Sequence, residues 1–278
     1  MYRHRIAIGL LGAALLLTAC GGGTTQQGVA NCTPKHQFET ISPGTLTVGV
    51  HDLPPYSMTT GQDGMGGVDA EIVREIAKRE CLTITAQPGN TPSLIPSVQQ
   101  GRADIAIGDW YRTEARSKVV NLTDPLYLDE MGIISAAGVS TVAEMEGKNV
   151  GTVDGYLWVK ELQAVLGDNL RLYPSSVDMN ADFKAGRIEI GVDSYGSALQ
   201  THKGTATKIE VAKPDDRVAA SKEAAQSTFP LVKDNQAMLD AFNATIAELH
   251  ADGTITRILK DHGLPESAEQ TGPPRLIK

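Results

Sequence analysis

Residues 82–108, LTITAQPGNTPSLIPSVQQGRADIAIG, contain the structural unit that recurs along most of this chain. LTITAQ (82–87) is rich in β-branched residues and predicts a strand. SLIPSVQQG (93–101) predicts a short helix that ends at Gly101, and ADIAIG (103–108) predicts a second strand. A strand, a helix and another strand in this order favour a parallel sheet that is covered by helices.

The same alternation extends to both sides of this unit. Toward the N-terminus we expect a strand at TLTVGV (45–50) and a helix that is capped by Asp69, with apolar residues at helical spacing over 72–77. After Gly138 the pattern starts again. The other expected elements are strands at 131–137, 149–153, 170–174 and 188–192 and helices from about Tyr156 to Leu166, up to Gly186, and from Asn235 to His250. Two rounds of this pattern predict two similar α/β lobes.

The first twenty residues indicate export. Met1 to Arg5 is positively charged, Ile6 to Leu17 is apolar but too short to span a bilayer, and LTAC (17–20) follows. We therefore expect residues 1–19 to be a signal peptide. The segment resembles a bacterial lipoprotein signal, which implies cleavage before Cys20 and a lipid on its thiol; an ordinary signal peptide with an incidental cysteine is the alternative. The mature protein would be anchored to the outer face of the cell membrane.

The two other cysteines, Cys32 and Cys81, form an even pair in an exported chain. A disulfide between them is the expected arrangement, and two unpaired thiols are the alternative. Residues 20–43 are polar and predict a flexible tether, and residues 266–278 are polar and contain proline, which predicts a loose tail. The segment between them suits two lobes of about 100 residues each.

Composition excludes one class of partner. The chain has 33 acidic and 25 basic residues and a formal net charge of −8, and removal of a signal peptide with Arg3 and Arg5 makes it more acidic. Since no basic stripe occurs, we expect no binding to nucleic acid. A hydrophobic content of 41% with 5% aromatic residues is typical of ordinary globular packing.

Ligands of open parallel sheets bind beyond the carboxyl ends of the strands, so the turns after the predicted strands are the places to search. The first turn, HDLPPY (51–56), is made rigid by two prolines and places Tyr56 either at the site or in a purely structural role. The second turn carries Asp109, Trp110 and Tyr111.

Arg116 follows this second turn. Thr113 is expected to cap a helix running toward Val120, with Glu114 beside the helix dipole and Arg116 in the first turn. From there the guanidinium could reach the cleft and pair with a carboxylate in bidentate geometry. The alternative is a surface arginine that bridges Glu114 or Asp124.

Two further turns lie in the second round of the pattern. Tyr156 and Trp158 follow Asp154, and Asp193 and Ser194 precede Tyr195. Aromatic side chains with carboxylates are suited to a desolvated cationic group. We therefore expect a solute that carries a positively charged or amidinium-like group as well as a carboxylate and that is not a plain neutral amino acid. An aromatic or aliphatic ligand on the same rings, or rings that only pack at the lobe rims, are the alternatives.

Several motifs resemble the family 3 extracellular solute-binding proteins of ABC importers. The resemblance covers about residues 45–264 and rests on LTVGVHDLPPYS (46–57), LIPSVQQGRADIAIG (94–108), RTEAR (112–116), NLTDPLY (121–127), GKNVGTVDG (147–155), AGRIEIGVDS (185–194) and AFNATIAELHADGTITRILKDHGL (241–264). It implies a two-lobe clamshell of the type II periplasmic-binding-protein kind. Lobe 1 would comprise 44–134 and 227–265, lobe 2 would comprise 135–226, and the hinge would cross near 132–138 and 223–230.

The same resemblance implies roles for single residues and for partners. In amino-acid binders of the family the arginine at the position of Arg116 grips the α-carboxylate, and the positions of Asp109 and Tyr111 contact the α-amino group. This chain departs from the pattern at Tyr156, Leu157 and Trp158, at Leu53, and at Ser194, which stands where an aspartate is expected. The arginine favours a carboxylated solute, whereas the departures argue against a standard α-amino acid. A monomer that serves a permease and an ATPase is expected.

Other functions have weaker support in the sequence. Ser194 lies in GVDSYG, which has one residue too many for the nucleophile elbow G-x-S-x-G, and the six histidines show no catalytic or metal-binding spacing. We therefore expect no catalytic residue, no metal and no cofactor. A subunit that presents its ligand to a membrane receptor, and an enzyme on a related clamshell, are the remaining alternatives.

Overall fold

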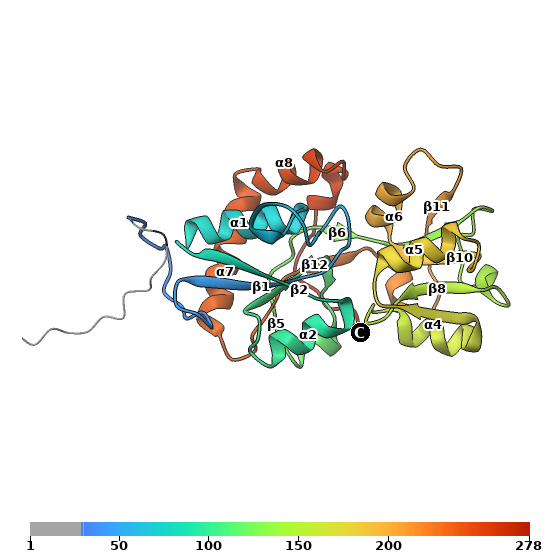
Figure 1. Cartoon of the computed structure of the whole chain (residues 1–278), viewed down its shortest axis with the longest axis horizontal. Coiled ribbons are helices and arrows are strands. Elements are labelled where there is room, and N and C mark those ends of the chain that lie inside the picture. The colour runs from blue at the N-terminus through green and yellow to red at the C-terminus, as the bar shows by residue number, and fades with distance from the viewer. Residues whose placement is uncertain (1–28, 30) are drawn as a thin grey trace, which may run out of the picture.

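Two five-stranded sheets form the cores of two lobes that lie side by side (Figure 1). The structure is a computed structural model that describes Val29 and residues 31–278. The predicted signal peptide and Cys20 lie outside the described residues. The architecture confirms the predicted two-lobe α/β clamshell.

Lobe 1 contains the strand–helix–strand unit of residues 82–108. Its sheet has the order β2-β1-β3-β13-β5, and β1 runs parallel to both β2 and β3. Figure 1 shows α1 and α8 on one side of this sheet and α2 on the other. The strands are β1 (Thr45–Val50), β2 (Thr83–Pro88), β3 (Ile105–Ile107), β5 (Asn121–Leu122) and β13 (Pro230–Leu231), and the helices are α1 (Val68–Arg79), α2 (Thr91–Gln99), α3 (Glu114–Ser117), α7 (Gln236–Ala251) and α8 (Thr254–Asp261).

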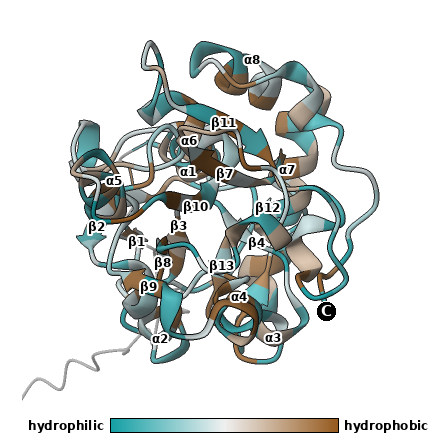
Figure 2. Ribbon diagram, turned by 90° about the vertical axis from the view of Figure 1, so that its right-hand side faces the viewer, coloured by the Kyte–Doolittle hydropathy of each residue, from teal (hydrophilic) through white to brown (hydrophobic). Residues whose placement is uncertain are grey.

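Lobe 2 repeats this design with the order β11-β7-β10-β8-β9. Strands β8, β9 and β10 are parallel, whereas β7 is antiparallel to its neighbours β10 and β11. The strands are β7 (Met131–Ser135), β8 (Val150–Val153), β9 (Leu170–Tyr173), β10 (Ile190–Ser194) and β11 (Lys208–Val211), and the helices are α4 (Val159–Leu166), α5 (Ser176–Lys184) and α6 (Tyr195–Thr201). Figure 2 shows apolar residues on the central strands, and every residue of β7 and β8 is buried.

A small third sheet forms the hinge between the lobes. It has the order β4-β12-β6, with β4 at Trp110–Tyr111, β6 at Leu128–Asp129 and β12 at Ala225–Thr228. The second crossing runs through β12, inside the predicted range 223–230. The first crossing was predicted too late, near 132–138, because β7 already pairs in the sheet of lobe 2 from Met131 onward. The apolar run at 131–137 gives no sign of where the chain changes its sheet.

The described part of the predicted tether, residues 31–43, is packed against lobe 1 instead of being loose. Cys32 and Cys81 form a disulfide with their Cα atoms 5.6 Å apart. The Phe38 side chain is 8% exposed and its ring lies 6.1 Å from that of Phe242 on α7. One covalent link and one buried ring therefore hold this segment, although its sequence shows no periodic pattern.

The prediction of a loose tail at 266–278 is also wrong. Glu266–Glu269 forms a short 3₁₀ helix, and Ile277 is 8% exposed and pairs with Thr113 in a parallel bridge. Figure 1 places the C-terminal end between the two lobes. The partners of this segment lie far away in the sequence, so its local composition could not reveal them. Among the described residues, no helix has the length and apolar character needed to cross a membrane.

Candidate functional site

Seven of the nine predicted ligand-binding residues meet around a small space between the lobes. The space has a volume of about 20 Å³, which is room for about one water molecule. Its lining residues from the prediction are Asp109, Trp110, Tyr111, Arg116, Tyr156, Trp158 and Ser194, and they are joined by Leu53, Thr91, Gly108 and Leu157. Five turns and strand ends from both lobes thus converge at one place, as expected for the carboxyl ends of parallel strands.

Arg116 connects the two lobes. Thr113 caps α3 by accepting a hydrogen bond of 3.1 Å from the backbone N–H of Arg116. The Arg116 guanidinium donates to the carbonyl of Tyr111 at 2.8 Å and to that of Gly155 in lobe 2 at 3.3 Å, and it lies 4.9 Å from the ring centroid of Trp110. Burial lowers the pKa of Arg116 to about 10, so the group stays charged at neutral pH. Three of its five N–H donors remain for other acceptors.

The turn before Arg116 has an unusual backbone that Asp69 holds in place. Gly108 and Asp109 adopt positive φ angles of 124° and 51°. A Cβ atom at Gly108 would lie 2.0 Å from Nε2 of His51, so only glycine fits there. The Asp69 carboxylate accepts from the backbone N–H of Gly108 at 2.8 Å and from that of Asp109 at 2.9 Å. Asp69 is therefore not the predicted cap of α1; Gly67 occupies the cap position.

The Asp109 side chain is buried near Asp129 and Ser227. It is 7% exposed, and neither of its carboxylate oxygens accepts a hydrogen bond from a described residue. Burial raises the pKa of Asp109 well above its usual range, and the negative charge of Asp129 raises it further. The indole Nε1 of Trp110 is likewise buried without an acceptor. Since buried polar groups are normally paired, an unpaired acceptor and an unpaired donor that line one space indicate a polar ligand.

Asp129, on the hinge strand β6, is the most important site residue that the sequence did not reveal. One of its carboxylate oxygens accepts from the Tyr56 hydroxyl at 2.8 Å and from the Gly196 backbone N–H at 3.2 Å. The other accepts from the Tyr111 hydroxyl at 2.6 Å. Asp129 therefore ties two tyrosines of lobe 1 to the start of α6 in lobe 2.

The aromatic residues pack on each other and orient their polar atoms. The Trp158 ring lies 6.1 Å from Tyr111 and 5.2 Å from Tyr156, and its Nε1 donates to the Thr152 hydroxyl at 2.8 Å. The Tyr156 hydroxyl donates to Asp193 at 3.1 Å. The predicted helix start at Tyr156 is three residues too early, since α4 begins at Val159. Tyr156 and Trp158 therefore lie in the loop before α4, and both line the space between the lobes.

Three acidic or aromatic residues that the sequence placed near the site do not line the space. Tyr56 is buried and stacks on Tyr127 with ring centroids 5.3 Å apart, but it does not line the space. Asp193 lies behind Tyr156 and accepts from the hydroxyl of Ser176 and the N–H of Ser194; burial raises the pKa of Asp193 to about 6. Asp154 is exposed. These residues follow the correct strands, but their side chains point elsewhere.

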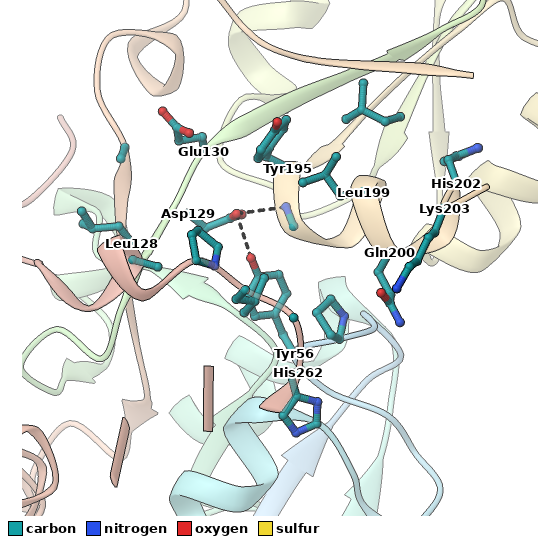
Figure 3. A pocket seen from close by; sticks show the side chains of 18 of the residues that line it. Tyr56, Leu128, Asp129, Glu130, Tyr195, Leu199, Gln200, His202, Lys203 and His262 are labelled. Carbon is teal, nitrogen blue, oxygen red and sulfur yellow. Dashed lines mark hydrogen bonds between the residues drawn. The ribbon is translucent and has the colours of Figure 1, made fainter. Parts of the chain in front are cut away.

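A larger pocket of about 950 Å³ is lined by Tyr56 and Asp129, neither of which lines the smaller space (Figure 3). Figure 3 shows Tyr195 and Leu199 of α6 facing this pocket, with Glu130 at the hinge and His262 across from them. Size alone would favour it as the ligand site. None of Arg116, Asp109 and the two tryptophans lines it, however, so the chemistry favours the smaller space. Among the described residues, no group of three or more histidine, cysteine or acidic side chains is placed to hold a metal ion.

Comparison with known proteins gives a consistent result. Residues 46–265 match the profile of the bacterial extracellular solute-binding proteins, family 3. The L-cystine-binding protein TcyJ of Escherichia coli K12 is 28% identical over 222 residues, which are 76% of this chain and 80% of that protein. The lysine/arginine/ornithine-binding periplasmic protein of the same strain is 25% identical over 231 residues, with coverage of 81% and 87%.

Solved structures share the fold. The amino acid substrate-binding protein AbpA of Streptococcus pneumoniae, bound to L-arginine, superposes with a TM-score of 0.71 at 23% identity and covers 81% of this chain and 97% of its own.

Proposed function

We propose, from the premise that this chain belongs to the bacterial extracellular solute-binding proteins of family 3, that it captures an amino acid or amino-acid-like solute between its lobes. The solute carries a carboxylate and a positively charged or amidinium-like group, and it is not a plain neutral amino acid, whose only positive group is the α-ammonium. The protein is anchored to the outer face of the cell membrane through a lipid on Cys20 and delivers the solute to an ABC permease and its ATPase.

The observation that carries the proposal is that an arginine and a buried aspartate line the same small space between the lobes. The Arg116 guanidinium offers a permanently charged fork for a carboxylate. Asp109 offers two unpaired carboxylate oxygens for a cation. Trp110 lies under Arg116 and adds a ring face and a free indole N–H. A solute with both charges would satisfy all of these groups at once.

The named ligands of related proteins support this chemistry. Relatives are named for L-cystine, for lysine, arginine and ornithine, for histidine and for arginine. All of these are amino acids, and most have a second nitrogen-containing group. These relatives are only 25–28% identical to this chain, so their names support the class of solute and leave its identity to experiment.

Binding requires the lobes to move. The space of about 20 Å³ is far below the roughly 300 Å³ at which ligand pockets begin, and a Cβ atom at Gly155 of lobe 2 would lie 3.3 Å from Pro92 of lobe 1. We therefore expect an open form that admits the solute and a closed form that the solute stabilises, because it contacts both lobes.

Small-angle scattering tests this closure. The radius of gyration should fall when the protein is saturated with whichever of L-arginine, L-lysine and L-ornithine raises its melting temperature most. Exposed Asp154→Asn provides a control variant that should close to the same extent. An unchanged radius at saturation argues against closure as the binding mechanism.

The lipid anchor has a separate test. Cys20 precedes Cys32, which the disulfide joins to Cys81 of lobe 1, so we expect the anchor to leave the binding site unchanged. Cys20→Ala protein should leave the membrane fraction after cell fractionation and keep its solute affinity in calorimetry. Retention of the variant in the membrane would show that the lipoprotein interpretation is wrong.

A further inference from the structure

The segment Thr271–Ile277, called here the C-terminal strap, lies outside the residues that match the family and runs along the hinge. Gln226 of β12, which is 1% exposed, holds it with both ends of its side-chain amide. Its Nε2 donates to the carbonyls of Thr271 at 2.8 Å and Pro273 at 2.9 Å, and its Oε1 accepts from the N–H of Arg275 at 2.8 Å. A hinge strand is thus bound to the strap by three hydrogen bonds.

The far end of the strap supports the turn that carries Arg116. The N–H of Ile277 donates to the carbonyl of Arg112 at 3.0 Å, and the carbonyl of Ile277 accepts from the N–H of Glu114 at 2.8 Å. Glu114 is the first residue of α3, whose N–H has no partner within the helix. The strap therefore completes the N-terminal cap of the helix that presents Arg116, beside the bond that Thr113 makes.

This support matters because the local elements are short. Strand β4 has two residues and α3 has four, and a single helical turn is not stable by itself. The Ile277 side chain is 8% exposed and belongs to the buried cluster of lobe 2 that contains Tyr111 and Trp158. One residue of the strap is thus bonded to the Arg116 turn and packed with two aromatic residues of the site.

We propose that the C-terminal strap positions Arg116 for its ligand and couples that position to the hinge. Only the expected effect of the strap on solute affinity rests on the proposed function. The positioning of α3 itself is a property of the protein without any ligand. Ile277 is accordingly a positioning residue, since it does not line the space and acts through the Arg112–Glu114 turn and the buried cluster that contains Tyr111 and Trp158.

The neighbouring residue provides a matched control. Ile277 points inward, whereas Leu276 is 39% exposed. Ile277→Asp should increase the rate of amide hydrogen exchange in peptides that contain Glu114 and should weaken binding of L-arginine about tenfold, which corresponds to about 1.4 kcal/mol. Leu276→Asp should change neither quantity. Deletion of residues 271–278 should reproduce the effects of Ile277→Asp, and circular dichroism checks that each variant is folded.

The two measurements separate the two claims. If amide exchange at Glu114 is as slow after the deletion as in the parent protein, the strap does not hold α3. This result overturns the proposal whatever the affinity for L-arginine. Fast exchange with unchanged affinity also overturns the positioning role. If the parent protein binds none of L-arginine, L-lysine, L-ornithine and glycine betaine, the proposed ligand class is in error, and the exchange measurement still decides whether the strap holds α3.

Discussion

Replacement of Arg116 by alanine is expected to weaken solute binding by a factor on the order of 10² or more. The guanidinium lies between the lobes, and loss of one partner of a buried, hydrogen-bonded charge pair costs about 2–5 kcal/mol. The side chain also makes the contact with the Gly155 carbonyl, so its loss should favour the open form as well. Titration calorimetry with the best cationic amino acid measures the effect directly.

The stability of the Arg116→Ala protein should change little, because the guanidinium binds backbone carbonyls that water can reach once the lobes open. Arg102→Ala is the matched control, since Arg102 is an exposed arginine of the same lobe. It should keep the parent affinity. A near-native affinity of Arg116→Ala would show that the Arg116 guanidinium does not bind the carboxylate of the solute.

Replacement of Asp109 by asparagine is expected to have two large effects of opposite sign. Affinity for a cationic amino acid should fall about 10²-fold, because the charge that faces the ligand is lost. The free energy of unfolding of the ligand-free protein should rise at neutral and alkaline pH. Asparagine tolerates the positive φ of 51° at this position, so the backbone should not be strained.

The pH dependence follows from the raised pKa of Asp109. In the unfolded chain the carboxyl has an ordinary pKa of about 3.9. A folded-state pKa above this value means that folding is favoured while the group is protonated, and that stability is lost as the pH rises through the folded pKa. Asp109→Asn and the parent should therefore be about equally stable near pH 4. Above that, the variant should gain about 1.4 kcal/mol for each unit by which the folded pKa exceeds 3.9.

Denaturant titrations of both proteins from pH 4 to pH 9 measure this difference, and Asp154→Asn, at an exposed aspartate that does not line the space, serves as the control variant. A stability difference that does not change with pH would mean that Asp109 keeps an ordinary pKa. Unchanged affinity in Asp109→Asn would mean that the cation, if present, lies elsewhere.

The fold was predictable because its signals are local. Asn235 caps α7 by accepting from the N–H of Met238 at 3.0 Å, and Thr113 caps α3, both within three residues of the chain. The strand–helix alternation depends likewise on neighbouring residues. Turns that follow parallel strands meet at one edge of a sheet, and this rule was enough to bring Asp109, Arg116, Tyr156 and Ser194 together.

The features that escaped prediction depend on contacts between distant segments. Asp129 bonds to Tyr56, 73 residues earlier, and to Gly196, 67 residues later, and the sequence shows only one more aspartate before a strand. Asp69 was interpreted as a cap because it precedes a helical pattern, whereas its partners are the amides of a turn 39 and 40 residues away. The strap was missed for the same reason, since its hydrogen-bond partners Gln226 and Arg112 lie far from it in the sequence.

The central claim is that the space lined by Arg116 and Asp109 receives a solute with a carboxylate and a positive group other than the α-ammonium of a plain neutral amino acid. A thermal-shift panel tests this claim most directly. L-arginine, L-lysine, L-ornithine and glycine betaine are compared with L-leucine and L-phenylalanine at equal concentration. A ligand at 100 times its Kd stabilises the folded state by about 2.7 kcal/mol, which raises the Tm of a protein of this size by roughly 5–10 °C. The account predicts a rise of this order with at least one of the first four compounds and none with L-leucine or L-phenylalanine. A rise with L-leucine or L-phenylalanine and none with the first four compounds would contradict it.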